Sequence, residues 1–441
     1  MKLAGWGRHP VLEATTHTPR SFDALRQLVQ FEASLIARGN GRAYGDSAIN
    51  TSATIETRYL NRMIAFDPIA GQLVAEAGVL LADIIAAFLP RGWFPMVTPG
   101  TKFVTLGGAI AADVHGKNHH KDGSFRTCVD WIDVMGQEGN IQRCSRRDNA
   151  ALFDNTLGGM GLTGIILQAA IRLRPVETAW IRQTTIAAPN LKAAMAAFEG
   201  AQDATYSVAW IDCLGTGSNL GRALVMVGEH AVKTDLSPQQ ARAPFEVKGK
   251  RRLGVPMDFP TFALNRLAVR AFNALYYWAG ARKPEPQLVD WDSYFYPLDA
   301  ILGWNRIYGR QGFVQFQCVL PLDQSEDGLT ALLAKISNAG LSSFLAVLKR
   351  FGKQEGAFSF PMEGYTLALD FPVTTETLGL LNQLDQIVIT HGGRFYLAKD
   401  SRMTGATLRA SDPRVTDFQA FRDAQGCTSR FRSAQSERLA L

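Results

Sequence analysis

Residues 98–120 read TPGTKFVTLGGAIAADVHGKNHH, and this stretch indicates the class of fold more clearly than any other part of the chain. Gly107, Gly108 and Gly116 stand in it among small apolar residues, and a backbone without side chains can approach a flat or extended ligand closely. Two more glycine-rich loops precede residue 175, GNGRAYGD at 39–46 and GGMGLTG at 158–164. Three such loops in one region predict a first domain that binds a large phosphorylated cofactor.

The first of these loops does not fit the dinucleotide fingerprint. Its glycines are Gly39, Gly41 and Gly45, so the G-x-G-x-x-G spacing fails at Tyr44, and no amphipathic helix follows. A Rossmann fold is therefore not favoured. The loop still lets several backbone N–H groups converge on an anion. Alone it is more typical of a surface turn, and only the other two loops favour a cofactor.

The end of the opening stretch, HGKNHH, holds three of the seven histidines. A zinc site would use His115 with His119, four residues apart, together with His120 or Asp113. Gly116 and Asn118 disfavour a helix there, and the glutamate of a helical HExxH site is missing. We therefore expect no metal. A solvated loop remains an alternative, but a polar wall against the cofactor or the substrate is favoured.

The composition is that of a globular protein, with 46% hydrophobic and 20% charged residues. A chain of 441 residues is long enough for two domains. The net charge is +6 and no run of Lys and Arg forms a stripe, so we expect no nucleic-acid partner. An anionic substrate or cofactor suits this balance better.

The cysteines and the apolar segments bear on the compartment. The five cysteines are far apart, with no CxxC pair, which favours a reducing compartment. No stretch approaches the roughly eighteen unbroken apolar residues of a spanning helix. The N-terminal MKLAGWGRHP has no apolar core of a signal peptide. We therefore expect a cytoplasmic protein that does not span the membrane.

Apolar periodicity predicts strands and helices in both halves of the chain. In the first half the predicted segments are a helix from 20, a strand at 34–39, a strand at 72–78, a helix at 81–89, a hairpin at 129–144, a short helix at 149–153 and a strand after 164. In the second half strand-like runs alternate with helical patterns, the strands at 313–321, 344–352, 365–372 and 394–402 and the helices at 329–340 and 380–393. This predicts a second, α+β domain with a largely antiparallel sheet.

The middle of the chain has a different character. Residues 236–260 are basic and rich in proline, which is typical of a mobile loop. Residues 262–278 then mix apolar and aromatic side chains with Arg266 and Arg270, and Arg282 follows closely. Such a segment can lie on a membrane surface. It can equally be a core-packing helix whose arginines reach solvent, and the sequence leaves both alternatives open.

Four polar residues stand in or beside apolar strands of the second half. Gln315 and Gln317 point to the same face of their strand, and their amides need partners if that face is buried. A partly exposed edge strand is the alternative. Lys349 and Lys399 lie in or beside later strand-like runs. An isolated lysine there can extend to solvent, or it can serve chemistry if burial lowers its pKa.

Motifs along nearly the whole chain resemble one family. GRAYGDSAIN at 41–50, PGTKFVTLGGAIAADVHGKNHHKDGSF at 99–125 and GGMGLTGII at 158–166 resemble the flavin-binding loops of the vanillyl-alcohol-oxidase-type flavoproteins. FGKQEGAFSFP at 351–361 and LAKDSR at 397–402 are similar to motifs of a narrower group, the decaprenylphosphoryl-β-D-ribose 2-oxidases.

The resemblance implies an α+β fold. Its FAD-binding domain, of the vanillyl-alcohol-oxidase type with two subdomains, would comprise residues 1–178 and 394–441, and residues 179–393 would form the α+β substrate-binding domain. FAD is expected to be non-covalent, because Arg42 stands where covalent members often carry histidine. The implied cofactor-binding residues are Gly39, Asn40, Gly41, Arg42, Ala43, Tyr44, Gly45, Pro99, Gly100, Thr101, Thr105, Gly107, Gly108, Ala111, His115, Gly116, Asn118, Gly164 and Ile165.

The resemblance also implies roles at the substrate site. Lys399, Tyr44 and His115 would be catalytic. The substrate-binding residues would be Gln315, Gln317, Lys349, Arg306, Trp210, Lys117 and Thr366. Four positions depart from the family. Phe295 and Tyr296 stand where tyrosine and histidine are expected. Ala368 stands where a cysteine is attacked by covalent inhibitors, and Thr366 where asparagine is usual. An active-site nucleophilic cysteine is therefore not expected.

The implied activity is FAD-dependent oxidation of the 2-hydroxyl of a polyprenylphosphoryl pentose to the 2-keto sugar, with the C2 hydride passing to the flavin N5. A keto-sugar reductase would be the partner enzyme and complete an epimerisation to the arabinose form. The expected electron acceptor is quinone-like rather than oxygen. Peripheral contact with the inner face of the cytoplasmic membrane is also expected. The alternatives are a soluble alditol or sugar-lactone oxidase that uses oxygen, and a flavin-binding partner subunit without chemistry.

Overall fold

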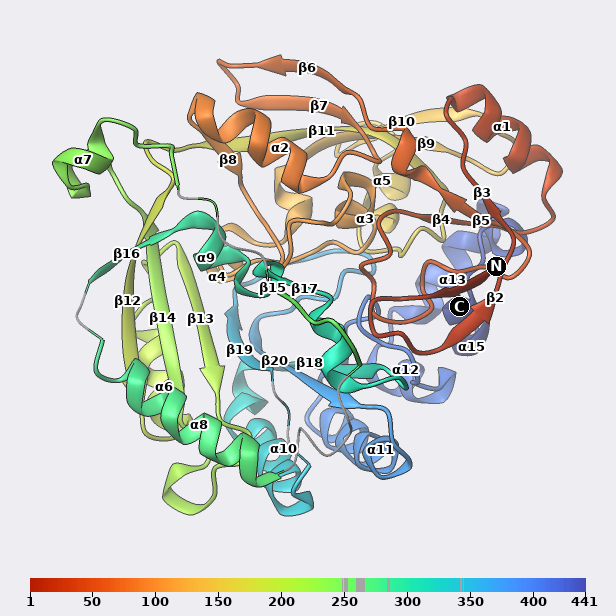
Figure 1. The fold of residues 1–441 in the computed structure, drawn as a ribbon. Helices are drawn as coiled ribbons and strands as arrows, with labels where there is room; N and C mark the ends of the chain where they lie inside the picture. Colours follow the sequence, from red (N-terminus) through yellow and green to blue (C-terminus); the bar gives the residue numbers. More distant parts are fainter. Residues whose placement is uncertain (248, 250–252, 259–265, 284–285, 342, 344) are drawn as a thin grey trace.

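A computed structural model describes residues 1–247, 249, 253–258, 266–283, 286–341, 343 and 345–441. In this part of the chain, two antiparallel sheets with their helices form two stacked portions (Figure 1). The α+β class predicted from the sequence is confirmed.

The first portion holds a sheet of six strands, counted over the described residues, in the order β10-β9-β11-β7-β6 with β8 paired to β11. Its strands are β6 (Met63–Asp67), β7 (Gln72–Glu76), β8 (Trp93–Pro95), β9 (Val129–Met135), β10 (Ile141–Ser145) and β11 (Ile165–Pro175). The predicted hairpin is the β9–β10 pair. Beside this sheet lie β1 (Lys2–Ala4), β2 (Val11–Glu13), β3 (Thr16–His17), β4 (Ile36–Arg38) and β5 (Thr54–Glu56), the last three parallel.

Helices of the first portion are α1 (Phe22–Phe31), α2 (Leu81–Phe88), α3 (Leu106–Ala111), α4 (His119–Asp122) and α5 (Ala150–Thr156). Helix α1 begins after Ser21, whose hydroxyl accepts from the Ala24 N–H, and its buried Leu25 and Val29 lie four residues apart. Helix α2 presents Leu81, Ile84 and Ile85 to the core, as its periodicity predicts.

The second portion is built on a sheet of eight strands within the described residues, in the order β16-β12-β14-β13-β19-β20-β18-β21. Its strands are β12 (Trp180–Ala188), β13 (Tyr206–Ile211), β14 (Ala223–His230), β16 (Gln287–Asp290), β18 (Phe313–Pro321), β19 (Ala346–Phe351), β20 (Gly364–Pro372) and β21 (Arg394–Phe395). The remaining elements up to residue 390 are α6 (Leu191–Glu199), α7 (Pro238–Ala241), β15 (Leu253–Gly254), α8 (Arg266–Gly280), α9 (Trp291–Phe295), β17 (Ile301–Leu302), α10 (Ser325–Ala339) and α11 (Thr375–Thr390).

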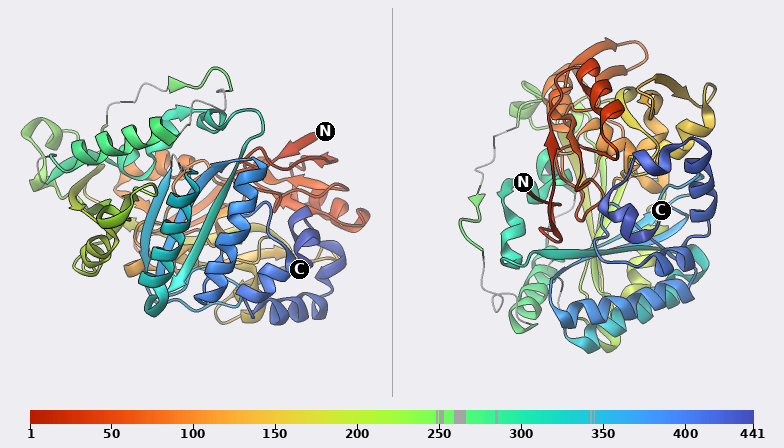
Figure 2. Two further views of the ribbon diagram at one scale, coloured as in Figure 1. Left: turned by 90° about the horizontal axis from the view of Figure 1, so that it is seen from below. Right: turned by 90° about the vertical axis from the view of Figure 1, so that its right-hand side faces the viewer.

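Strand alternation gives this large sheet two different faces. Phe316, Leu348 and Leu367 point to a core that they share with residues of α6, α10 and α11. The left view of Figure 2 shows α10 and α11 lying across this face. Residues one position along each strand, such as Gln317 and Lys349, point to the opposite face, which lines a cavity.

The C-terminal segment packs against the N-terminal one. It contains α12 (Gly405–Ser411), α13 (Val415–Ala424), α14 (Cys427–Arg430) and α15 (Ala434–Leu439). The Leu35 N–H donates to the Arg430 carbonyl at 2.8 Å, and Arg438 forms an ion pair with Asp46 at 2.8 Å. In the right view of Figure 2 these helices lie beside the first portion. The division into 1–178 with 394–441 and 179–393 remains a prediction.

Two local predictions were wrong. Residues 394–402 form a strand only at Arg394–Phe395, because the Tyr396 N–H donates to the Gln317 carbonyl and the Lys399 N–H back to Tyr396, which turns the chain. A helix was disfavoured around HGKNHH, yet α4 begins at His119, since the Asn118 carbonyl accepts from the Asp122 N–H. His115 lies outside that helix.

The basic middle segment is only partly described. Residues 248, 250–252 and 259–260 of the predicted mobile loop lie outside the described residues, as do 262–265 of the apolar segment. The rest of that segment is α8, on which Leu275 and Trp278 are more than half exposed. In the described part of the chain, no helix combines the length and the apolar character that crossing a membrane requires.

Candidate active site

One large cavity lies between the two portions. The first portion contributes residues of the loops 39–44, 98–108, 111–117 and 160–166, which contain the three glycine-rich motifs. The second portion contributes the strands β13, β18, β19 and β20, and the turn that carries Lys399. The cavity is therefore built by segments that are far apart in sequence.

The glycines of this wall let loops pack directly on one another. A Cβ on Gly107 would lie 2.8 Å from the Cβ of Ala77, and one on Gly116 would lie 2.9 Å from the Thr98 carbonyl oxygen. Both distances are shorter than ordinary contacts, so a side chain at either position would push the wall apart. Gly100, by contrast, has no neighbour within 4 Å on its open side.

Most of the predicted cofactor-binding residues meet at the cavity. Those that line it are Gly39, Asn40, Gly41, Arg42, Ala43, Tyr44, Pro99, Gly100, Thr101, Thr105, Gly107, Gly108, Ala111, His115, Gly116 and Gly164. Three do not. Gly45 packs on the Asp400 backbone, Asn118 donates to the Met96 carbonyl and to Asp122, and Ile165 lies in an apolar core.

The donors at this wall fit an anionic cofactor. The Arg42 guanidinium stacks on the Trp6 ring, 4.0 Å from its centre, and its buried Nε has no hydrogen-bond partner among the described residues. Burial lowers the pKa of Arg42 from its usual value. A buried cation with an unpaired donor is stabilised by a negative ligand such as a pyrophosphate. The residues present therefore fit FAD.

Three half-buried lysines line the cavity. Burial, followed by the charge of Lys349, lowers the pKa of Lys117 to about 7, and burial lowers the pKa of Lys349 to about 8. Lys117 Nζ donates to the Tyr294 carbonyl. Lys399 Nζ lies 3.5 Å from the centre of the Tyr44 ring, and burial lowers its pKa to about 7. Each lysine can thus lose its proton near neutral pH.

Asp370 is a functional candidate that the sequence analysis missed. It lies opposite Gln315 in the β18–β20 register, and its Oδ1 accepts from Gln315 Nε2. Oδ2 is buried without a partner among the described residues. Burial raises the pKa of Asp370 to about 7, while Gln315 and Lys399 act in the opposite direction. In the sequence, the sign of this residue is that it is the single carboxylate in the apolar run LALDFP.

His115 and Tyr44 are neutral. Burial and then the charge of Lys349 lower the pKa of His115 well below its ordinary value. Burial and then Asp370 raise the pKa of Tyr44 well above its ordinary value. The Nε2 of His115 lies 3.0 Å from the Nε2 of Gln317.

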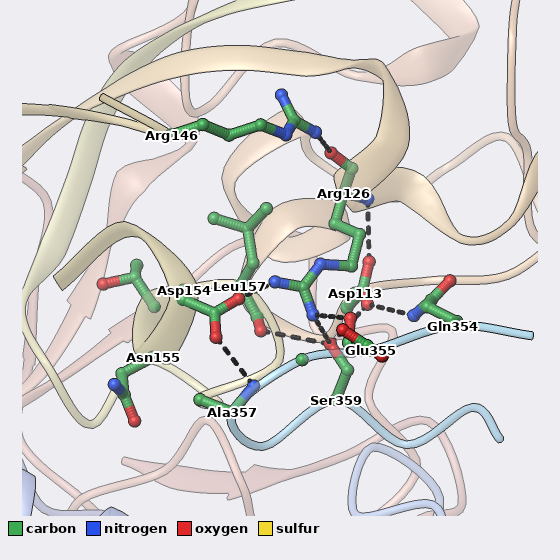
Figure 3. Close-up of polar contacts among 12 residues, drawn as sticks. Asp113, Arg126, Arg146, Asp154, Asn155, Leu157, Gln354, Glu355, Ala357 and Ser359 are labelled. Carbon is green, nitrogen blue, oxygen red and sulfur yellow. Dashed lines mark hydrogen bonds and ion pairs between the residues drawn. The ribbon is translucent and has the colours of Figure 1, made fainter. Parts of the chain in front are cut away.

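A polar cluster fixes the loop that carries His115 and Lys117. Figure 3 shows Asp113, Arg126, Gln354 and Ser359 joined across the two portions. The Asp113 carboxylate accepts from the Arg126 N–H at 2.8 Å and from Gln354 Nε2 at 3.2 Å, and Ser359 Oγ also donates to it. Because charged acceptors make the stronger hydrogen bonds, this cluster holds the loop rigidly.

His119 and His120 have structural partners. His119 Nε2 lies 3.1 Å from Gln354 Oε1, and His120 Nε2 lies 2.7 Å from the Ala204 carbonyl. Neither residue lines the cavity. Among the described residues, no group of three or more His, Cys, Asp or Glu side chains is arranged to hold a metal ion.

The predicted substrate residues meet at the cavity with one exception. Lys117, Trp210, Gln315, Gln317, Lys349 and Thr366 line it. Arg306 does not, because its exposed side chain donates to the carbonyls of Val255 and Pro256. None of the five cysteines, all of which the structure describes, lines the cavity, whereas Ala368 does. Aromatic wall residues that the sequence analysis missed are Trp6, Tyr276, Trp304 and Tyr396.

Comparison with known proteins supports this assignment. A family model described as an FAD binding domain matches residues 16–145. The chain is 34% identical to the decaprenylphosphoryl-β-D-ribose oxidase of Mycolicibacterium smegmatis, over 100% of this chain and 97% of that protein. It is 33% identical to an uncharacterized protein of Streptomyces coelicolor over 82% of this chain and 99% of that one. It is 27% identical to the L-gulonolactone oxidase of Bos taurus over 40% of this chain and 41% of that protein.

The cavity and the comparisons agree. The first portion is a vanillyl-alcohol-oxidase-type FAD-binding domain, and FAD is the cofactor. The chain belongs to the family of the decaprenylphosphoryl-β-D-ribose oxidases and is an FAD-dependent oxidoreductase.

Proposed function

We propose that the protein oxidises the 2-hydroxyl of a polyprenylphosphoryl pentose, such as decaprenylphosphoryl ribose, to the 2-keto sugar. The observation that carries the proposal is the set of three half-buried lysines in one cavity, Lys117, Lys349 and Lys399. Asp370 acts as a counter-charge to Lys399, whereas burial lowers the pKa values of Lys117 and Lys349, so their charged forms favour an anionic substrate. A sugar phosphate is such a substrate.

Lys399 is the proposed base. Its pKa is lowered to about 7, so a large share of the side chain is a neutral amine at neutral pH. A neutral amine can take the hydroxyl proton as the hydrogen leaves carbon, and the Tyr44 ring then stabilises the resulting ammonium. Bound FAD supplies the acceptor for the two electrons and the hydrogen.

Lys117 and Lys349 are the proposed phosphate ligands. Both lie in the cavity wall and both have lowered pKa values, so binding a phosphate raises their pKa values and restores their charge. Gln315 and Gln317 supply hydrogen bonds that orient the sugar, and Thr366 lies beside Gln317 in the same wall. Trp210 supplies an apolar surface beside Tyr276, with ring centres 4.9 Å apart.

The lipid tail has a proposed exit beneath α8. The cavity wall becomes apolar at Val208, Met226 and Tyr276, and Tyr276 is also 40% exposed. Leu275 and Trp278 are exposed on the same helix, near the exposed Arg270 and Arg282. Apolar side chains beside cations suit contact with an anionic membrane surface. We therefore propose peripheral contact with the inner face of the cytoplasmic membrane.

Membrane contact is tested by vesicle flotation. The double variant L275D/W278D should lose most of its binding to vesicles containing anionic lipid, because two apolar side chains are replaced by negative ones that the anionic lipid repels. I69D is the matched control, since Ile69 is 96% exposed on the other portion. Equal flotation of the wild type and the double variant would remove the membrane role.

The product and the reoxidation step imply partners. A keto sugar on a lipid carrier is a substrate for a keto-sugar reductase, and the pair would convert the ribose form to the arabinose form. A quinone-like acceptor in the membrane is the proposed oxidant of the reduced cofactor. An enzyme of cytoplasmic location with peripheral membrane contact would reach both.

The deciding experiment is anaerobic mixing of the holoprotein with decaprenylphosphoryl ribose while the flavin absorbance is followed. Bleaching is expected with this substrate and not with free ribose. Turnover of free alditols or lactones with stoichiometric peroxide would instead favour the soluble oxidase. No bleaching with any of these sugars would favour a flavin-binding subunit without chemistry.

A further inference from the structure

Thr366, Gln317 and His115 form a buried row along the cavity wall. Gln317 Nε2 lies 3.3 Å from Thr366 Oγ1 and 3.0 Å from His115 Nε2. Thr366 Oγ1 in turn donates to the Cys318 carbonyl oxygen at 2.8 Å. All three side chains line the cavity and are more than nine-tenths buried. Buried polar groups are nearly always hydrogen-bonded, so the position of each proton in the row can be inferred from the available partners.

The Thr366 hydroxyl determines how the Gln317 amide is oriented. The hydroxyl has one proton, and the shorter contact places it on the Cys318 carbonyl. Oγ1 is then an acceptor toward Gln317, so the amide nitrogen must face it. With the amide turned over, its oxygen would meet an oxygen that has no proton left to donate, and a buried acceptor pair is unfavourable.

The same orientation determines the tautomer of His115. The second amide proton of Gln317 points at His115 Nε2, so this nitrogen accepts. A neutral imidazole that accepts at Nε2 carries its proton on Nδ1. The Nδ1 atom is buried and has no partner among the described residues. Because its Nε2 lone pair is occupied by Gln317, His115 is not available there as a base.

The row leaves one polar atom of Gln317 unused. Within the part of the chain that the structure describes, no group donates a hydrogen bond to Gln317 Oε1. Since the side chain lines the cavity, this oxygen is an acceptor for a hydroxyl of a bound ligand.

We propose that Thr366 is a positioning residue: through its hydroxyl it holds the Gln317 amide so that Oε1 accepts a hydrogen bond from the substrate, and it holds His115 as the Nδ1–H tautomer. The role of Oε1 rests on the proposed oxidation of a sugar hydroxyl. The tautomer of His115 does not depend on the substrate.

The tautomer is tested by NMR on the resting holoprotein with ¹⁵N-labelled histidine, using H115Q to assign the His115 signals. At neutral pH we expect Nδ1 protonated and Nε2 unprotonated. T366S should leave this pattern unchanged, whereas T366V, which removes the hydroxyl at constant shape, should give a mixture of both tautomers. A proton on Nε2 in the wild type, or an unchanged pattern in T366V, would overturn the proposal. The wild-type measurement needs no variant to fold.

The role of Oε1 is tested by anaerobic titration with polyprenylphosphoryl ribose. T366V should weaken substrate binding or slow flavin reduction roughly five- to tenfold, as expected for one misoriented hydrogen bond, and T366S should restore the wild-type value. Wild-type behaviour of T366V would reject the role in substrate binding. If the wild-type flavin is not reduced at all, the proposed function fails while the NMR result stands.

Discussion

At the scale of single residues, the chemistry depends on Lys399, whose Nζ lies over the Tyr44 ring inside the cavity. We expect Lys399→Met to keep FAD and to lower the rate of anaerobic flavin reduction by about 10²–10⁴-fold, the usual contribution of a positioned base. Stopped-flow absorbance gives the rate, and Lys335→Met on the exposed side of α10 is the control. Loss of FAD from the variant would make Lys399 a cofactor anchor instead.

The charge of Asp370 gives a second prediction at the residue scale. A negative Asp370 raises the pKa of Lys399, so Asp370→Asn should move that pKa below about 7. Because the neutral amine is the active form, the reduction rate rises with pH through this pKa, and the acidic limb should shift to lower pH in the variant. The groups that also face this pair are Tyr44, Tyr308, Lys349 and His115. The profile of Asp83→Asn, an exposed site, should match the wild type, and an unmoved limb in Asp370→Asn would reject the coupling.

At the scale of elements, alternate side chains of strand β18 serve different purposes, one set packing in the core and the other facing the cavity. Phe316 packs into the core under the helices, whereas Gln317 faces the cavity. Phe316→Ala should lower the free energy of unfolding by about 3–5 kcal/mol through the cavity it leaves. Gln317→Ala should change that free energy much less and act on substrate binding. Urea denaturation compares the two, and equal losses would contradict the two-faced sheet.

At the scale of the whole molecule, residues of both portions line the cavity that would hold FAD. A ligand that binds only the folded state stabilises it by an amount that grows with the logarithm of the free ligand concentration above its dissociation constant. Removal of FAD should therefore lower the melting temperature, and added FAD should restore it. Riboflavin, which lacks the pyrophosphate and the adenine, should restore it much less. Identical melting of the FAD-free and FAD-loaded proteins would argue against a cofactor that bridges both portions.

The sequence predicted the features that depend on local pattern. Helix α2 and the β9–β10 hairpin follow directly from apolar periodicity. The glycine-rich loops were recognised from sequence because a residue without a side chain lets the backbone approach a ligand closely, whatever the surrounding fold. The strand prediction for residues 394–402 was wrong because the Lys399 N–H closes a turn on the Tyr396 carbonyl, although the apolar residues there resemble a continuing strand.

By itself, therefore, the sequence determined the α+β class, the cofactor loops and the shared face of Gln315 and Gln317, because helix and strand periods and glycine geometry are local properties. Only the tertiary structure placed Asp370 opposite Gln315, excluded Arg306 from the cavity and joined Thr366, Gln317 and His115 in one row. These relations depend on strand register and on contacts between segments far apart in the chain, and burial then sets the charge of each group.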